Sequence, residues 1–182
     1  MTSANVTAAK PKVGGAIYVA PTGTTLPTDS TTALAAAFTE LGYASEDGLT
    51  NSSNPENESI KAWGGDVVLS LMTGREDTFS FTLIEAINDE VLKLVYGDTN
   101  VTGALATGLS VAVNTKDLES HAFVFEMVLK GNATKRVVIP SAKVTEVGEV
   151  TYSDSAAVGY AITLTATADS SGNTHYEYIK TA

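Results

Sequence analysis

The sequence contains no cysteine among its 182 residues, and this absence excludes two kinds of site. Disulfide bonds cannot form, and metal centres with thiolate ligands are ruled out. A chain of this length buries roughly 70% of the surface that its unfolded form exposes, so it does not need such cross-links to fold. We therefore expect one domain that is held together by its hydrophobic core.

Long apolar runs are missing as well. No segment approaches the roughly twenty consecutive apolar residues of a membrane-spanning helix. Residues 1–15 lack the apolar centre of a secretory signal. We therefore expect that this chain does not insert into a membrane.

Basic residues are few. Eleven Lys and Arg residues are set against twenty-one Asp and Glu residues, which gives a formal net charge of −10. The only adjacent basic pair is Lys135-Arg136, whereas binding to nucleic-acid phosphates needs clustered Lys and Arg. The acidity has two interpretations, which charge alone does not separate. It keeps the protein soluble, or it forms a surface that DNA passes without being held.

The residue patterns of common catalytic sites are also absent. A metal site would need His121 and His175, the only two histidines, together with carboxylates. Neither a G-x-S-x-G elbow nor a glycine-rich phosphate loop occurs. The acid pair Glu56 and Glu58 lies in the most loop-like part of the chain, whereas catalytic carboxylates need rigid support. We expect no enzyme, no metal site and no cofactor.

What the sequence does contain is a series of short segments in which apolar and polar residues alternate, the pattern of half-buried strands. Thr73-Gly74-Arg75-Glu76 suits a hairpin turn between the second and third of these segments. Short strands around one inserted helix predict a mainly β fold, an antiparallel sandwich or barrel. The predicted strands are 14–20, 66–73, 78–83, 108–114, 121–130, 134–140, 143–152, 158–168 and 175–180.

A single helix is predicted at about 88–96. Asn88 suits the N-cap, and Asp89 and Glu90 follow in the first turn, where the helix dipole favours acids. Gly97 suits the position just after the last helical residue.

Residues 44–65 interrupt the alternation with a long polar run. An unstructured connection of more than about 12–15 residues is uncommon in a compact domain and usually means a functional or disordered loop. The large apolar residues of the run are Leu49, Ile60 and Trp63. Trp63 has two interpretations, as an anchor on a partner or as a plug in the core of its own chain.

Three predicted strands have solvent faces that are unusually small and uncharged. An ordinary exposed face carries more Lys, Glu and Arg. Such a surface suits the wall of a wide water-filled barrel, but Thr also has a high strand propensity, and both interpretations stay open. The residues of these faces are Thr78, Ser80 and Thr82 in the strand at 78–83, Thr163, Thr165 and Thr167 in the strand at 158–168, and Ser110, Ala112 and Asn114 at 110–114.

Several segments carry a resemblance to a known family. They are GYASEDGLTNSSNPENESIKAWGGD at 42–66, the strand-to-helix passage at 78–97, and the closing strands RVVIPSAKVTEVGEV and GYAITLTA. In their order along the chain and in their amino-acid sequence, they resemble the major tail proteins of long-tailed, siphovirus-type bacteriophages. These proteins are the subunits of the tail tube.

The resemblance implies a β-sandwich with one flanking α-helix, a flexible N-terminal arm at 1–13 and a single tail-tube domain at 14–182. Subunits of the family form hexameric rings with a continuous β-barrel lumen, and stacked rings form the tube through which DNA is ejected. It further implies a tape-measure protein, a tail terminator and distal tail or baseplate proteins as partners. The location would be the virion tail, assembled in the host bacterial cytoplasm.

The resemblance also assigns tasks to residues. The segment 44–65 would reach the adjacent ring and be disordered in the free subunit, with Leu49, Asn54, Glu56, Glu58, Ile60 and Trp63 as candidates for the contact. The faces with Thr78, Ser80, Thr82, Thr163, Thr165 and Thr167 would line the lumen. Two alternatives remain, a secretion-system ring protein of the same fold and an unrelated β-sandwich binding module.

Overall fold

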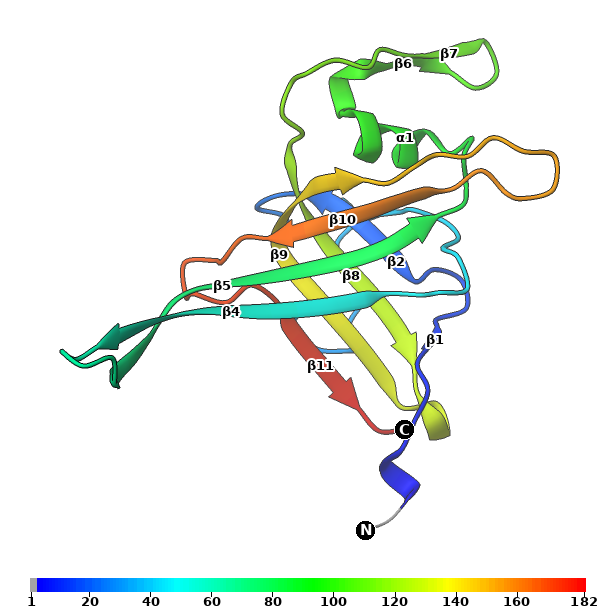
Figure 1. Ribbon diagram of the computed structural model, residues 1–182. Helices are drawn as coiled ribbons and strands as arrows, with labels where there is room; N and C mark the ends of the chain where they lie inside the picture. Colours follow the sequence, from blue (N-terminus) through cyan, green and yellow to red (C-terminus); the bar gives the residue numbers. More distant parts are fainter. Residues whose placement is uncertain (1–2) are drawn as a thin grey trace.

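A computed structural model describes residues 3–182 as an antiparallel β structure with one α-helix in that range (Figure 1). Short 3₁₀ turns occur at Ser3–Asn5, Asp98–Asn100 and Lys130–Asn132. The helix α1 spans Asp89–Tyr96. The strands are β1 Lys10–Pro11, β2 Ile17–Pro21, β3 Thr39–Glu40, β4 Thr50–Lys61, β5 Val67–Leu83, β6 Val101–Ala104, β7 Gly108–Val111, β8 Ser120–Val128, β9 Thr134–Val147, β10 Tyr160–Ala166 and β11 Tyr176–Lys180.

The main sheet folds over itself because β9 serves both of its halves. The strand order is β3-β2-β8-β9-β10-β5-β4, with β1 added to β8 and β11 added to β9. The first half of β9 pairs with β11, and its end, residues 142–147, pairs with β10. In Figure 1, β10, β5 and β4 consequently cross in front of β2 and β8, which gives the two layers of a sandwich.

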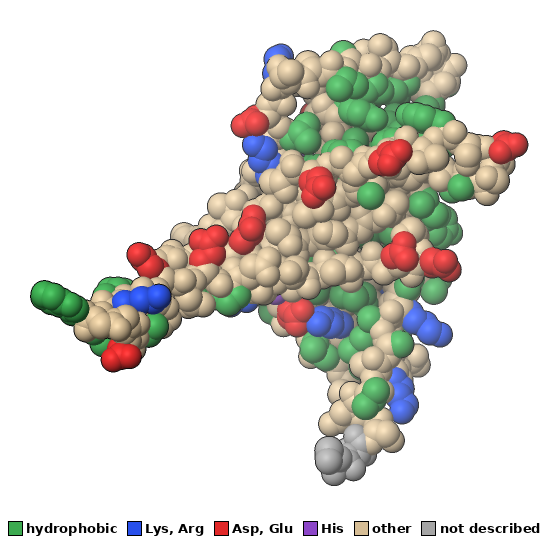
Figure 2. Space-filling model, viewed as in Figure 1, with side chains coloured by type: hydrophobic (Ala, Val, Ile, Leu, Met, Phe, Trp, Pro, Cys, Tyr) green, Lys and Arg blue, Asp and Glu red, His purple; other side chains and the backbone are tan. Residues whose placement is uncertain are grey.

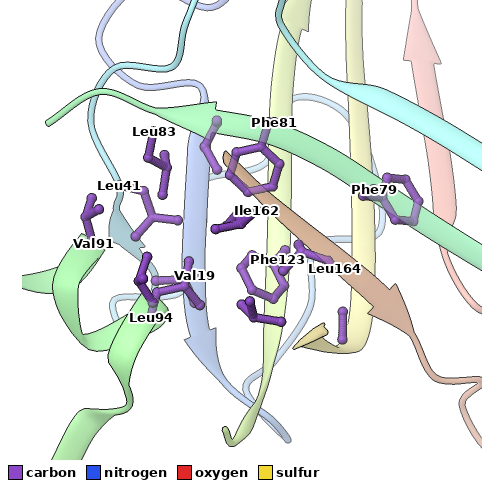
Figure 3. Packing of buried hydrophobic residues seen from close by; sticks show 14 of the residues in the cluster. Val19, Leu41, Phe79, Phe81, Leu83, Val91, Leu94, Phe123, Ile162 and Leu164 are labelled. Carbon is purple, nitrogen blue, oxygen red and sulfur yellow. The ribbon is translucent and has the colours of Figure 1, made fainter. Parts of the chain in front are cut away.

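The core lies between these layers (Figure 3). Phe79 and Phe81 of β5 face Phe125 of β8, and the rings of Phe81 and Phe125 meet edge to face at 5.3 Å. Leu164 of β10 belongs to the same buried cluster. Helix α1 closes one end of the core, with Leu94 among its buried residues. The antiparallel β fold with one flanking helix is confirmed.

The helix forms where its local signals predicted it. The Asn88 side chain accepts a hydrogen bond from the backbone N–H of Glu90, which satisfies one free donor of the first turn. At the other end Gly97 has φ +100°, and its N–H donates to the carbonyl of Lys93 at 2.7 Å. Glycine adopts this φ without the strain that a side chain would add.

The hairpin predicted around Thr73–Glu76 is wrong. The predicted strands 66–73 and 78–83 form one continuous strand, β5, and its hairpin partner is β4. The chain turns instead at residues 62–66, where the N–H of Ala62 donates to the carbonyl of Asp66 at 2.7 Å. The ladder with β4 continues through the polar residues 73–76, with a register shift after the Glu56↔Gly74 pair, so the turn-forming residue types there do not end the strand.

The prediction that 44–65 lacks regular structure is wrong for residues 50–61, which form β4. Every residue of β4 is exposed, so burial does not hold the strand in place. Its order comes from the backbone ladder with β5, which runs from the Thr50↔Ser80 pair to the Lys61↔Val67 pair. Amino-acid composition reflects only the side chains of the segment, so it does not predict order that comes from backbone pairing with another strand.

Two further strand predictions change in the structure. The strands predicted at 134–140 and 143–152 are one strand, β9, which passes through Pro140. The strand predicted at 108–114 ends at Val111 and pairs only with β6, in a small hairpin beside α1 (Figure 1). The other predicted strands are confirmed, with ends that shift by up to three residues.

The N-terminal segment is attached to β8 over residues 10–12. Lys10 and Pro11 pair with β8, and Lys12 forms an ion pair with Glu126. Glu126 also pairs with Arg136, and both side chains are at least 95% buried, so neither charge is left alone in the core. Residues 1 and 2 lie outside the described residues, and the flexibility of the N-terminal segment 1–13 stays a prediction.

Candidate assembly surfaces

One face of the strands β9, β10, β5 and β4 carries small hydroxyl side chains, and we call it the hydroxyl face. Thr163 lies opposite Ser80, and Thr165 lies opposite Thr78. Their hydroxyls bond across the strands, with Ser80 Oγ and Thr163 Oγ1 3.1 Å apart. The reverse side of β5 and β10 bears the buried Phe and Leu residues, so the period of two places these residues as predicted. Thr82 lies on the hydroxyl face as well, opposite Ala161.

Strand β4 widens the hydroxyl face by one strand beside β5. Because Thr50 pairs with Ser80 and Ser52 pairs with Thr78, Thr50 and Ser52 point to the same side. Thr167 does not belong to this pattern, because β10 ends at Ala166 and Thr167 lies just beyond the strand.

The charges on the hydroxyl face are mainly acidic. Glu146 lies opposite Thr163, and Glu76 follows on β5. Lys143 lies opposite Thr165, and its ammonium group is 3.1 Å from the Asp117 carboxylate, which compensates its charge. Figure 2 shows this side as a largely uncharged surface with scattered acids. Such a surface offers DNA phosphates no cluster of cations to bind.

Both margins of this four-strand layer have free backbone groups. The outer edge of β4, twelve residues long, has no partner strand in residues 3–182. On the other side, pairing of β8 with β9 stops at Lys143, so the last residues of β9 pair only with β10. An unpaired edge is a template for a further strand. This layer can therefore continue into another chain at either margin.

The outer part of the β4–β5 hairpin, residues 54–76, projects far from the body, and we call it the arm (Figure 1). All of its residues except Gly74 are exposed. An isolated two-stranded hairpin is only marginally stable in water, and a large exposed apolar patch marks an interaction site. The exposed apolar residues of the arm are Ile60, Trp63, Val67, Val68, Leu69, Leu71 and Met72.

The predicted contact residues fall in two places. Asn54, Glu56, Glu58 and Ile60 lie on β4 within the arm, and Trp63 lies at its turn. Leu49 lies outside the arm and packs against the core of its own chain.

Trp63 is fully exposed, so the interpretation that it plugs its own core is wrong. Figure 2 shows hydrophobic side chains gathered at the tip of the arm.

Sequence reasoning missed the apolar residues on the β5 side of the arm. Alternation predicts a half-buried strand at 66–73, but Val67, Leu69 and Leu71 are all exposed. The sequence itself argues against a half-buried strand, because Val68 and Met72 make the opposite face of the strand apolar as well. Apolar residues on both faces do not fit a strand with one face toward a core and the other toward water.

A buried carboxylate lies at the base of the arm. The Asp77 side chain is 0% exposed and accepts a hydrogen bond from the Thr174 hydroxyl and one from Arg75 Nε at 3.2 Å. Burial acts to raise the pKa of Asp77, but hydrogen bonds from Ser53, Thr174 and Arg75 outweigh it and hold the pKa below its ordinary value. His175 Nδ1 lies 3.9 Å from the same carboxylate.

The described part of the chain shows no arrangement for metal chemistry. No group of three His, Asp or Glu side chains in residues 3–182 could hold a metal ion. The two histidines lie beside different acids, His121 near Asp98 and His175 near Asp77. Among the helices of these residues, none has the length and apolar character needed to cross a membrane.

Comparison with known proteins identifies the family. A family model described as phage tail tube protein matches residues 2–182, essentially the whole chain. No curated protein matches. The mainly antiparallel β structure with one helix agrees with this family. Members are structural proteins of the virion tail that assemble into a tube. The chain belongs to the phage tail tube protein family.

Proposed function

We propose that this protein assembles into hexameric rings that stack into the tail tube, through which DNA is ejected into the host. The observation that carries the proposal is the four-strand layer with an open edge on each side and a hydroxyl face. The family match favours this function over a secretion-system ring protein of similar fold, and over an unrelated binding module.

Ring formation follows from the two open edges. The outer edge of β4 in one subunit would pair with the end of β9 in the next, so that each copy seals the unpaired strand of its neighbour. The two edges belong to different strands, so the contact is head-to-tail, and such contacts close into a ring when the rotation allows it. Six copies would then share one continuous barrel wall.

The hydroxyl face would line the lumen. Thr78, Ser80, Thr82, Thr163 and Thr165 give a smooth wall of short side chains. The neighbouring acids repel phosphates, so DNA slides along this wall and does not condense on it. Thr167, beyond the end of β10, would lie at the rim of the wall.

Ring stacking would use the arm. Docking the arm on the adjacent ring removes Ile60, Trp63 and the apolar residues of β5 from water, which is the dominant favourable term in association. Glu58 lies opposite Leu71, and Glu56 and Asn54 follow toward the base of the arm, opposite Gly74 and Glu76. These three polar residues would form the polar rim of the contact. Leu49 contributes indirectly, by packing under the start of β4.

Further partners follow from this function. A tape-measure protein would fill the lumen before DNA, a tail terminator would cap one end, and distal tail or baseplate proteins would form the other. Assembly would take place in the host cytoplasm. The segment 1–13 would supply a flexible contact between subunits.

Cysteine cross-linking tests the ring contact directly, because the natural chain has no cysteine. The double variant S52C/E146C places one thiol on β4 and one near the end of β9. A thiol cross-linker of moderate reach should give a ladder that stops at six subunits in a denaturing gel. Single variants should give no ladder, because a head-to-tail contact does not bring a residue next to its own copy. No ladder from the double variant, or one that stops elsewhere, would contradict the hexameric ring.

A further inference from the structure

Asp77 occupies the point where β5 leaves the body and becomes the arm. By the period of two it continues the core face of Phe79 and Phe81, and its side chain is fully buried. The residues between the turn and Asp77, apart from Gly74, are solvent-exposed. A charged group therefore ends the hydrophobic core on this side.

The carboxylate connects three parts of the chain. Arg75 belongs to the arm strand of β5, and Ser53 is the cross-strand partner of Asp77 on β4. Thr174, ninety-seven residues further along, lies just before β11, and its hydroxyl donates to Asp77 Oδ2. The next residue, His175, packs its ring edge-on against Phe79 at 5.2 Å. The segment before β11 is thus fixed both to the core and to the base of the arm.

Burying a carboxylate destabilises the folded state unless hydrogen bonds satisfy it. An apolar side chain would fill the same space without this loss of free energy. What the carboxylate adds is direction, because hydrogen bonds hold their partners within narrow limits of distance and angle. The orientation of the arm relative to the body matters because the arm is long. Ten residues, 67–76, separate Asp77 from the turn, a reach of about 33 Å at ~3.3 Å per residue. A rotation of about 10° at the base would move the tip by about 6 Å, more than the length of a hydrogen bond.

We propose that Asp77 is a positioning residue, which together with Thr174 sets the direction of the arm and couples it to the C-terminal strand. The inference rests on the proposed function, because the direction of the arm decides whether its tip meets the adjacent ring. It also assigns a task to the segment 173–175, since displacement of that segment by a partner would release the arm.

The test removes one hydroxyl. Thr174→Val takes away the bond to Asp77, and Thr174→Ser keeps it. Thr134→Val is a matched control, because it deletes another half-buried hydroxyl, bonded to Ser30 at 2.8 Å, at the opposite end of β11. Hydrogen–deuterium exchange of residues 54–76 in the free subunit should rise in T174V and stay at the wild-type level in T174S and T134V. Equal exchange in T174V and wild type would overturn the proposal.

Assembly gives the second readout. The critical concentration for tube formation should rise about tenfold in T174V, which corresponds to ~1.4 kcal/mol. It should stay near the wild-type value in T174S and T134V, although T134V loses comparable stability in urea. An equal rise in T134V would show a general loss of stability and contradict a positioning role. If wild type forms no tubes, the proposed function fails, and the exchange measurement still decides the role of Asp77.

Discussion

Replacing Trp63 by alanine separates the stability of the subunit from the stability of the tube. Trp63 is fully exposed at the tip of the arm, so the free subunit loses no buried surface. The free energy of unfolding should change by less than about 0.5 kcal/mol, as for most surface substitutions.

The tube, by contrast, should lose a large contact. An aromatic side chain buries about 150–250 Å². At ~25 cal/mol per Å² this gives an upper bound of about 4–6 kcal/mol. Ordering costs reduce such values, and truncating a central aromatic residue costs about 2 kcal/mol or more. The critical concentration should therefore rise about 30-fold or more, since ~1.4 kcal/mol is a factor of ten.

The assay uses the fact that Trp63 is the only tryptophan. Its fluorescence should shift to shorter wavelength as tubes form, because the indole leaves water. Sedimentation of tubes gives the critical concentration, and urea unfolding gives the stability of the subunit. Trp63→Phe should recover most of the assembly, since it keeps an aromatic ring. An unchanged emission spectrum in tubes, or normal assembly of W63A, would refute the contact.

Three other predictions concern the lumen, the base of the arm and the helix. The double variant T163K/T165K should form tubes but slow DNA passage, because two lysines per subunit would bind phosphates; unchanged infectivity of phage that carry it would count against the lumen assignment. Because the pKa of Asp77 is lowered in the folded state, its contribution to stability should be complete above its ordinary pKa of about 3.9 and be lost as the pH falls toward the lowered value. Urea unfolding across this range should show a steeper loss for wild type than for Asp77→Asn, and equal slopes would contradict the assignment. Asn88→Ala should cost about 1 kcal/mol in urea unfolding, and Asn88→Ser should cost less, because serine keeps an oxygen that accepts from the first turn of α1; equal losses would disprove the capping role.

The sequence predicted those features whose cause is local. The cap at Asn88 and the glycine at position 97 place the helix, because each signal acts within one or two turns. The hydroxyl face followed from strict alternation, since Thr163 and Thr165 share a side in any regular strand. The identity of the neighbouring strands was not needed for either conclusion.

Features that depend on distant pairing were not predicted. Strand β4 is ordered only because β5 lies beside it, and its own polar side chains carry no strand signal. The length of β5 was missed for the same reason, because the polar residues at 73–76 are acceptable in a strand whose two faces both meet water. The Asp77–Thr174 bond joins residues that nothing in the sequence links.

The central claim is that copies of this chain seal one another's open strand edges around a lumen. A cryo-electron microscopy map of the assembled particle tests this most directly. We predict backbone pairing between β4 of one subunit and the end of β9 in the next, with Ser80 and Thr163 on the inner wall. An inner wall built from other residues, or a β4 edge that stays unpaired in the assembled particle, would contradict it.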